Sequence, residues 1–191
     1  MRPLALTVIR EEHQALAAML RSIPLLLAHA RRAGEMPDFA VLRAMLFYID
    51  EFPERLHHTK ESELLFPVVR ARAPEVGDTL DKLDRDHASG ERAIRELEHR
   101  LLAFEVMGEP RRAAFEEAVK RYIDFYLAHM LVEEEQVLPA AQKHLSSADW
   151  SSLDAAFAAN RDPLTGHEAA DEYRPLFQQI LNRAPAPVGL G

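Results

Sequence analysis

The sequence predicts an all-α protein, an up-and-down four-helix bundle over residues 1–145 followed by a helical extension and tail over residues 146–191. Three observations lead to this expectation. Residues that favour helices dominate the 191-residue chain, only 7 glycines occur, and no stretch alternates between apolar and polar residues as a strand would. Runs containing glycine and proline divide the first part into four long segments. Each long segment carries one histidine on its apolar face.

Four long helices are expected, over about residues 4–32, 38–73, 75–108 and 110–144. Asp38 can cap the second helix, which continues through two internal prolines. The third helix ends near Gly108, and Pro110 suits the first turn of the fourth. The extension should contain two short helices, one capped by Ser146 and reaching about residue 160, the other over residues 167–181.

The four histidines, one on each long helix, are related by reflection about the expected turns: His13, His57, His87 and His129. His13 and His57 are equally distant from residue 35, and His87 and His129 are equally distant from Gly108. Antiparallel neighbours bring such residues to the same height, since a helix rises about 1.5 Å per residue. The four imidazoles should therefore lie in one layer, and helical bundles build metal sites in such layers.

A glutamate follows three of these histidines at the fourth position: Glu61, Glu91 and Glu133. On a helix this spacing places both side chains on one face. The stretch from His57 to Pro67 is echoed from His129 to Pro139, which indicates a duplicated helix pair. Each glutamate alone could lie on the solvated face, but buried carboxylates without a cation would be costly. We therefore expect seven metal ligands: His13, His57, Glu61, His87, Glu91, His129 and Glu133.

The ligand types limit the choice of metal. Imidazole and carboxylate without any cysteine suit iron, with zinc or manganese as alternatives. Two carboxylates among four imidazoles could bridge, which suits two metal ions better than one structural zinc. His58 points about 100° away from His57. It is expected beside the site or on the surface, near enough to be a spare ligand.

Composition disfavours several other classes of function. The formal net charge of −8 disfavours a nucleic-acid-binding or anionic-lipid surface. Without cysteine there is no disulfide, thiolate zinc site or cysteine-held iron–sulfur cluster. Neither a secretory leader pattern nor an apolar run of about 20 residues is present. We expect a cytoplasmic protein that binds neither nucleic acid nor membrane, and a homo-oligomer is compatible with the sequence.

The motif His57-His58-Thr59-Lys60-Glu61, continued by Leu65-Phe66-Pro67, resembles the HHxxEExxLFP signature of the hemerythrin-like family, also called the HHE cation-binding domain. The resemblance covers about residues 5–145. It implies a four-helix bundle that holds two non-haem irons, bridged by two carboxylates and an oxo or hydroxo group. In this chain His13 and His57 would ligate one iron and His87 and His129 the other, while Glu61 and Glu133 would bridge them.

The chain departs from the oxygen carriers of that family. They have a histidine where this chain has Glu91, and their last carboxylate corresponds to Glu134 rather than Glu133. A carboxylate in place of an imidazole should stabilise iron(III). Reaction with oxygen, nitric oxide or peroxide, or the sensing of iron status, is then favoured over reversible oxygen carriage. The expected function is therefore the binding or sensing of oxygen, nitric oxide, peroxide or iron status. A di-iron oxidase or peroxidase and a metal-free helical interaction module are the alternatives.

Overall fold

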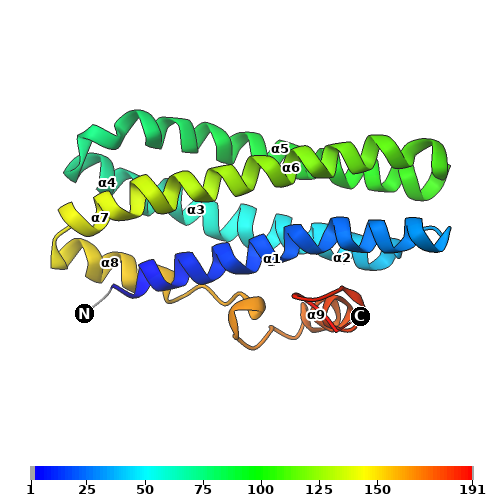
Figure 1. The fold of residues 1–191 in the computed structure, drawn as a ribbon. Coiled ribbons are helices and arrows are strands. Elements are labelled where there is room, and N and C mark those ends of the chain that lie inside the picture. The colour runs from blue at the N-terminus through cyan, green and yellow to red at the C-terminus, as the bar shows by residue number, and fades with distance from the viewer. Residues whose placement is uncertain (1–2, 191) are drawn as a thin grey trace.

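The computed structural model describes residues 3–190; residues 1, 2 and 191, at the outer ends of the two expected segments, lie outside the described part. The described chain consists of helices and connecting loops, without a strand (Figure 1). None of the helices in this range is long and apolar enough to cross a membrane. The predicted all-α class is confirmed.

Four antiparallel helical rods form the bundle (Figure 1). The first rod is α1 (Leu4–Ala33) and the third is α5 (Gly77–Met107). The second rod consists of five consecutive segments: α2 (Phe39–Ile49), η1 (Asp50–His57), α3 (His58–Lys60), η2 (Glu61–Leu65) and α4 (Phe66–Arg72). The fourth rod consists of three: α6 (Arg112–Val132), η5 (Glu133–Val137) and α7 (Leu138–His144). The short 3-10 turns η3 (Pro74–Val76) and η4 (Glu109–Arg111) precede the third and fourth rods.

The segments η1, η2 and η5 are π-helical. In each, the backbone N–H that follows the segment donates to the carbonyl five residues earlier: His58 to Pro53, Phe66 to Glu61 and Leu138 to Glu133. A π turn holds one residue more than an α turn, so it rotates successive side chains by a smaller angle. Neighbouring residues on these rods can therefore both reach the interior.

The repeated sequence pattern becomes a repeated backbone feature. The π segments η2 and η5 begin at Glu61 and Glu133, and a proline stands two residues after each segment ends, at Pro67 and Pro139. Proline has no N–H to donate, and its ring displaces the carbonyl four residues earlier, so a regular α turn is disfavoured there. Both glutamates thus enter the bundle at equivalent wide turns.

Two apolar clusters fill the bundle on either side of a buried polar layer. One contains Leu20 and Phe104 among its fully buried members, and the other contains Leu6 and Phe66. In the first three rods the polar residues of the layer fall between the positions that contribute to the two clusters, and in the fourth rod Glu133 does so, while His129 stands next to Met130 of the first cluster. Apolar packing above and below therefore fixes the height of the polar layer and keeps water from it.

The C-terminal extension comprises residues 146–190. It contains α8 (Ser147–Phe157), which packs against α1, and α9 (Arg174–Arg183), which packs against α2. As predicted, Ser146 caps α8, in a reciprocal capping box with Asp149. The second helix was expected from residue 167 but begins at Arg174, where Pro175 suits its first turn. The intervening loop runs along the bundle beside α1 (Figure 1).

Candidate metal centre

Seven side chains from all four rods form the buried polar layer, and each is at most 8% exposed: His13, His57, His58, Glu61, His87, His129 and Glu133. Six of them are residues that the sequence predicts to lie together. The reflection about the expected turns therefore places the histidines correctly. The seventh is His58, which was expected beside the site or on the surface because it points about 100° away from His57 on a regular helix.

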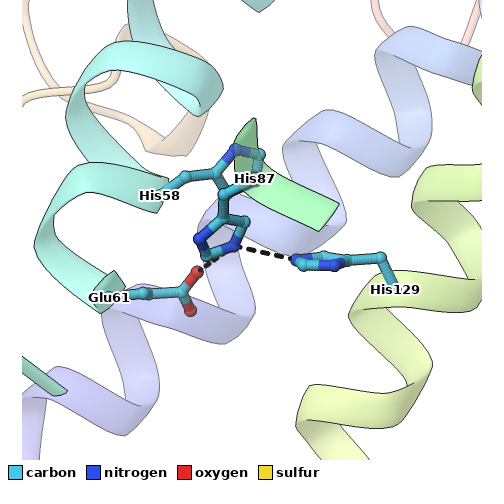
Figure 2. Close-up of side chains that lie close together, drawn as sticks. All are labelled: His58, Glu61, His87 and His129. Atoms are coloured by element: carbon cyan, nitrogen blue, oxygen red, sulfur yellow. Dashed lines mark hydrogen bonds and ion pairs between the residues drawn. The ribbon is translucent and has the colours of Figure 1, made fainter. Parts of the chain in front are cut away.

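The first group of donors combines three imidazoles and one carboxylate, contributed by α3, η2, α5 and α6: His58, Glu61, His87 and His129 (Figure 2). One donor atom from each lies within 4.8 Å of the others. The Nε2 atoms of His87 and His129 are 3.0 Å apart, and Nε2 of His87 lies 3.6 Å from Glu61 Oε2. Such converging nitrogen and oxygen atoms could hold one metal ion.

The second group contains two imidazoles and the same carboxylate: His13, His57 and Glu61. Nε2 of His57 lies 3.3 Å from Glu61 Oε1, and Nε2 of His13 lies 3.9 Å from the same oxygen. Two imidazoles with one carboxylate are the donor set of many non-haem iron sites that retain open positions. This group could hold a second metal ion.

Both glutamates reach across the two groups. Glu61 directs Oε1 towards His57 and Oε2 towards His87. Glu133 places Oε2 at 3.3 Å from His13 Nε2 and Oε1 at 3.2 Å from His129 Nε2. Each carboxylate therefore directs one oxygen to each of the two donor groups, which is the arrangement needed to bridge two cations.

The inward atoms of the layer are short of partners. In the part of the chain that the structure describes, seven buried atoms of the layer make no hydrogen bond. They are Nε2 of His13, His57 and His58 and both carboxylate oxygens of Glu61 and Glu133. Their mutual contacts lack hydrogen-bond alignment. A buried polar atom without a partner costs about 1–3 kcal/mol, and a charged one costs more. Metal ions would satisfy these atoms together.

Each imidazole is oriented by a polar side chain at its other ring nitrogen, Nδ1. The partners and distances are Glu134 for His13 (3.0 Å), Glu12 for His57 (2.7 Å), Glu54 for His58 (3.1 Å), Ser62 for His87 (2.8 Å) and Asp86 for His129 (3.5 Å). A carboxylate only accepts, so it keeps the proton on Nδ1 and leaves the Nε2 lone pair facing the layer. Carboxylate–histidine pairs of this kind are typical of metal sites.

The electrostatics of the layer also favour cations. Burial lowers the pKa of His13, but the close carboxylate of Glu133 and the hydrogen bond with Glu134 outweigh it and raise that pKa to about 9. For His57, the effect of burial is outweighed by Glu61 and Glu12, so its pKa also rises. Protons on these imidazoles compensate the buried carboxylates when metal ions do not.

His58 differs from the other histidines in its charge environment. Burial and the neighbouring imidazoles of His87 and His57 lower its pKa well below the usual value. Its ring is stacked between His87, at 4.4 Å, and Tyr126, at 5.2 Å between ring centroids. A neutral imidazole with a free Nε2 is the form that binds a metal ion.

Behind His58 lies a buried hydrogen-bonded cluster. Tyr122 and Tyr126 both donate their hydroxyl protons to Glu54 Oε1, at 2.5 and 2.6 Å, while Glu54 Oε2 faces His58. Burial raises the pKa of Glu54, and these tyrosine hydrogen bonds oppose that rise. The cluster holds Glu54 in one position, and Glu54 in turn holds the His58 ring.

The comparison with protein families agrees with this geometry. A model of the hemerythrin HHE cation-binding domain matches residues 4–141, which is most of the chain. The chain belongs to the hemerythrin HHE cation-binding domain family. A search of curated proteins and a search of solved structures found no significant match. Cation binding is thus the family property, and the two donor groups are the candidate location for it in this hemerythrin-like chain.

Glu91 does not join the layer, contrary to the sequence prediction. Its side chain is 51% exposed and forms an ion pair with Arg95 on the outer face of α5. A spacing of four residues on an α-helix leaves a rotation of about 40°, which is enough to turn a carboxylate from the interior to the flank. The space beside His87 is filled by the stacked ring of His58.

The ambiguity between Glu133 and Glu134 is resolved by burial. Glu133 is 1% exposed and enters the layer, whereas Glu134 is 40% exposed and contacts His13 from outside. The π segment that begins at Glu133 turns this residue inward. The carboxylate one turn after His129 therefore takes the inner position in this hemerythrin-like bundle.

The residues that orient the imidazoles were not predicted from the sequence. One of them carried a recognisable signal, since Glu54 precedes His58 by four residues, as a helical neighbour would. Asp86 and Ser62 reach histidines on other rods, and Glu12 reaches His57 on a different helix. Only the packing of the rods reveals these pairs.

The exposed position of Glu91 leads to a direct test. Glu91→Ala should leave the metal content of the purified protein unchanged, because only the ion pair with Arg95 is lost. Its unfolding free energy should change by less than about 0.5 kcal/mol. His58→Ala is the contrasting variant and should lower the metal content. Quantitative metal analysis of both variants decides the matter; loss of metal from Glu91→Ala would return this residue to the ligand set.

Proposed function

We propose that this hemerythrin-like chain is a non-haem di-iron protein that binds or senses a small ligand such as oxygen, nitric oxide or peroxide. The observation that carries the proposal is the pair of buried carboxylates, Glu61 and Glu133. Each of them directs one oxygen to the first donor group and the other oxygen to the second. A single structural metal would need neither bridging carboxylate nor a second imidazole group. Nitrogen and oxygen donors without thiolate favour iron, with manganese or zinc as alternatives.

The proposed ligand sets are unequal. One iron would be held by His58, His87 and His129, and the other by His13 and His57, with both glutamates shared between them. The site with two imidazoles has fewer protein donors and so has more positions left for an external ligand. When bound, the di-iron centre would supply redox-active metal with open positions.

The surroundings of the two-imidazole site support a very small ligand. A cavity of about 10 Å³ borders His13 and His57, with Phe52 and Leu16 among its apolar lining residues. This volume is about what one water molecule requires. The cavity is therefore of a size for a very small ligand, and a larger substrate would require the surrounding side chains to move.

The proposal is tested by metal analysis and optical spectroscopy on protein produced in iron-rich medium. Two irons per chain are expected, with an oxidised spectrum that changes when azide or nitric oxide is added. His57→Ala should lose this response. Protein that stays free of metal would contradict the proposal and favour an interaction module. One tetrahedral zinc per chain would also contradict it.

A second candidate function, a di-iron oxidase or peroxidase, is favoured by the tyrosine cluster. Tyr126 stacks on His58, and both Tyr122 and Tyr126 donate to the carboxylate that orients it. Buried tyrosines this close to the proposed metal site would be suited to donate a proton, together with an electron, to chemistry at that site. Steady-state peroxide consumption by the iron-loaded protein, abolished in His57→Ala, would favour the enzyme over the binding protein.

A further inference from the structure

One residue of the C-terminal extension reaches the metal centre. Asn160 follows α8 and is 5% exposed, although it stands in a loop. Its side-chain amide donates to both oxygens of Glu12, at 2.8 and 2.9 Å. Glu12 in turn accepts the proton of His57 Nδ1 at 2.7 Å. A continuous chain of hydrogen bonds therefore links the extension to an imidazole of the two-imidazole site.

This chain of contacts determines how His57 is presented. Glu12 is 8% exposed, so its carboxylate depends on protein donors in place of water. With the amide of Asn160 on one side and His57 on the other, the carboxylate stays in place. His57 then keeps its proton on Nδ1 and directs Nε2 towards Glu61, 3.3 Å away.

The loop that carries Asn160 is held by the bundle on both sides. Lys60 donates to the Asn160 side-chain oxygen and, at 2.9 Å, to the backbone carbonyl of Ala156. Two residues further on, Asp162 accepts the hydroxyl proton of Tyr48 at 2.6 Å. Asn160 therefore has a defined position relative to the site. It also lines the small cavity beside His13 and His57.

We propose that the C-terminal extension completes the metal centre, and that Asn160 acts as a positioning residue for His57 through Glu12. The inference rests on the proposed di-iron function, but it concerns residues beyond 141, where the family match ends. The loss of Asn160 should therefore affect only one of the two proposed metal sites. Asn160 supports the metal held by His13 and His57, while His58, His87 and His129 have their own orienting partners.

The test replaces Asn160 by aspartate in the full chain. Asn160→Asp keeps the shape of the side chain but removes the amide donor and places a negative charge beside Glu12. We expect affinity at one of the two metal sites to fall about 10- to 100-fold, as is typical when an orienting partner of a ligand is lost. Iron-57 Mössbauer spectra should show one of the two iron signals altered and the other retained. Zinc titration of the metal-free protein gives an independent measure of both affinities.

Two further variants separate positioning from general folding. In the double variant Glu12→Gln/Asn160→Asp, the new amide can donate to residue 160 and its oxygen can accept from His57, so affinity at the weakened site should partly recover. Asn182→Asp is the matched control, because Asn182 is exposed on α9 in the same extension, and it should behave as wild type. If Asn160→Asp fails to fold, Asn160→Ala should show the same one-site loss without the added charge.

Unchanged affinity at both sites in folded Asn160→Asp and Asn160→Ala would overturn the inference. Equal weakening of both sites without recovery in the double variant would also overturn it, because it would indicate a general loss of packing. Failure of the wild-type chain to bind two metals would instead refute the proposed function. The two failures are therefore distinguishable.

Discussion

Removal of the metal ions should lower the unfolding temperature, and the difference between loaded and metal-free protein should widen as the pH rises from 6.5 to 9. A ligand bound only by the folded state stabilises it by about 4 kcal/mol at a thousandfold excess over its Kd, so tight binding at the candidate metal centre would give a large effect. Without metal, the inward atoms of the layer depend on protons for compensation. Thermal unfolding of both forms across this pH range measures the effect.

The pH dependence follows from His13. Burial lowers its pKa, but Glu133 and Glu134 raise it to about 9 in the metal-free fold, compared with 6.5 for an ordinary histidine. The stability from this proton is complete below pH 6.5 and is lost as the pH rises through 9. At about 1.4 kcal/mol per pKa unit, the loss is on the order of 3 kcal/mol. Metal-loaded protein should not lose it, because a metal ion bound at His13 would take the place of that proton.

Two variants serve as controls for this prediction. His13→Ala should reduce the pH dependence of the metal-free protein over the same range, and His57, whose pKa is also raised, should account for the part that remains. His29→Ala, which alters an exposed histidine of the same helix, should leave it unchanged. Equal unfolding temperatures of the loaded and metal-free wild type from pH 6.5 to 9 would show that the buried layer does not depend on metal.

Gly90→Ala should destabilise the protein by about 1–3 kcal/mol and disturb the three-imidazole site, although it changes no proposed ligand. A Cβ atom at Gly90 would lie 1.6 Å from the hydroxyl oxygen of Tyr126 and 2.5 Å from the ring carbon that bears it. Tyr126 is fully buried and cannot simply swing into solvent. Its displacement would break the hydrogen bond to Glu54 and shift the ring stacked on His58.

Denaturant unfolding and the iron spectrum measure the two consequences separately. Gly77→Ala is the matched control on the same helix, since its nearest neighbour would be Arg70 Nη1 at an ordinary 3.8 Å. That change should be neutral or stabilising by up to about 1 kcal/mol, because alanine favours a helix over glycine. Adding Tyr126→Phe to Gly90→Ala removes the hydroxyl and should restore part of the stability. Wild-type stability and spectrum in Gly90→Ala would refute the close contact.

The sequence alone determined the fold class and the height of the polar layer. Both follow from properties that act along the chain, namely helical periodicity, the positions of the breakers and a constant rise per residue. Because antiparallel rods convert equal distances from a turn into equal heights, the four reflected histidines and the glutamates Glu61 and Glu133 were predicted to lie together. The structure places these six residues in one buried layer.

The direction in which each side chain leaves its helix axis was decided by the tertiary structure. Regular α-helical angles favoured Glu91 and disfavoured His58, but π turns near Pro53 and Pro67 change the direction of side chains on the second rod. His58 consequently enters the layer, while Glu91 on the regular helix α5 faces solvent. A local wide turn depends on which backbone hydrogen bonds the packed bundle permits, and a periodic pattern does not encode it.

Contacts between distant segments were likewise decided only by packing. Glu12 reaches His57 across two rods, and Asn160 reaches Glu12 from 148 residues away in the chain. No spacing rule connects such positions, because their distance depends on how α8 and the following loop settle against α1. The sequence thus indicated that imidazole and carboxylate groups meet in a buried layer, whereas the packed structure specified which side chains orient these groups. The physical reason is that periodicity sets height and approximate face, while side-chain direction depends on every neighbour at once.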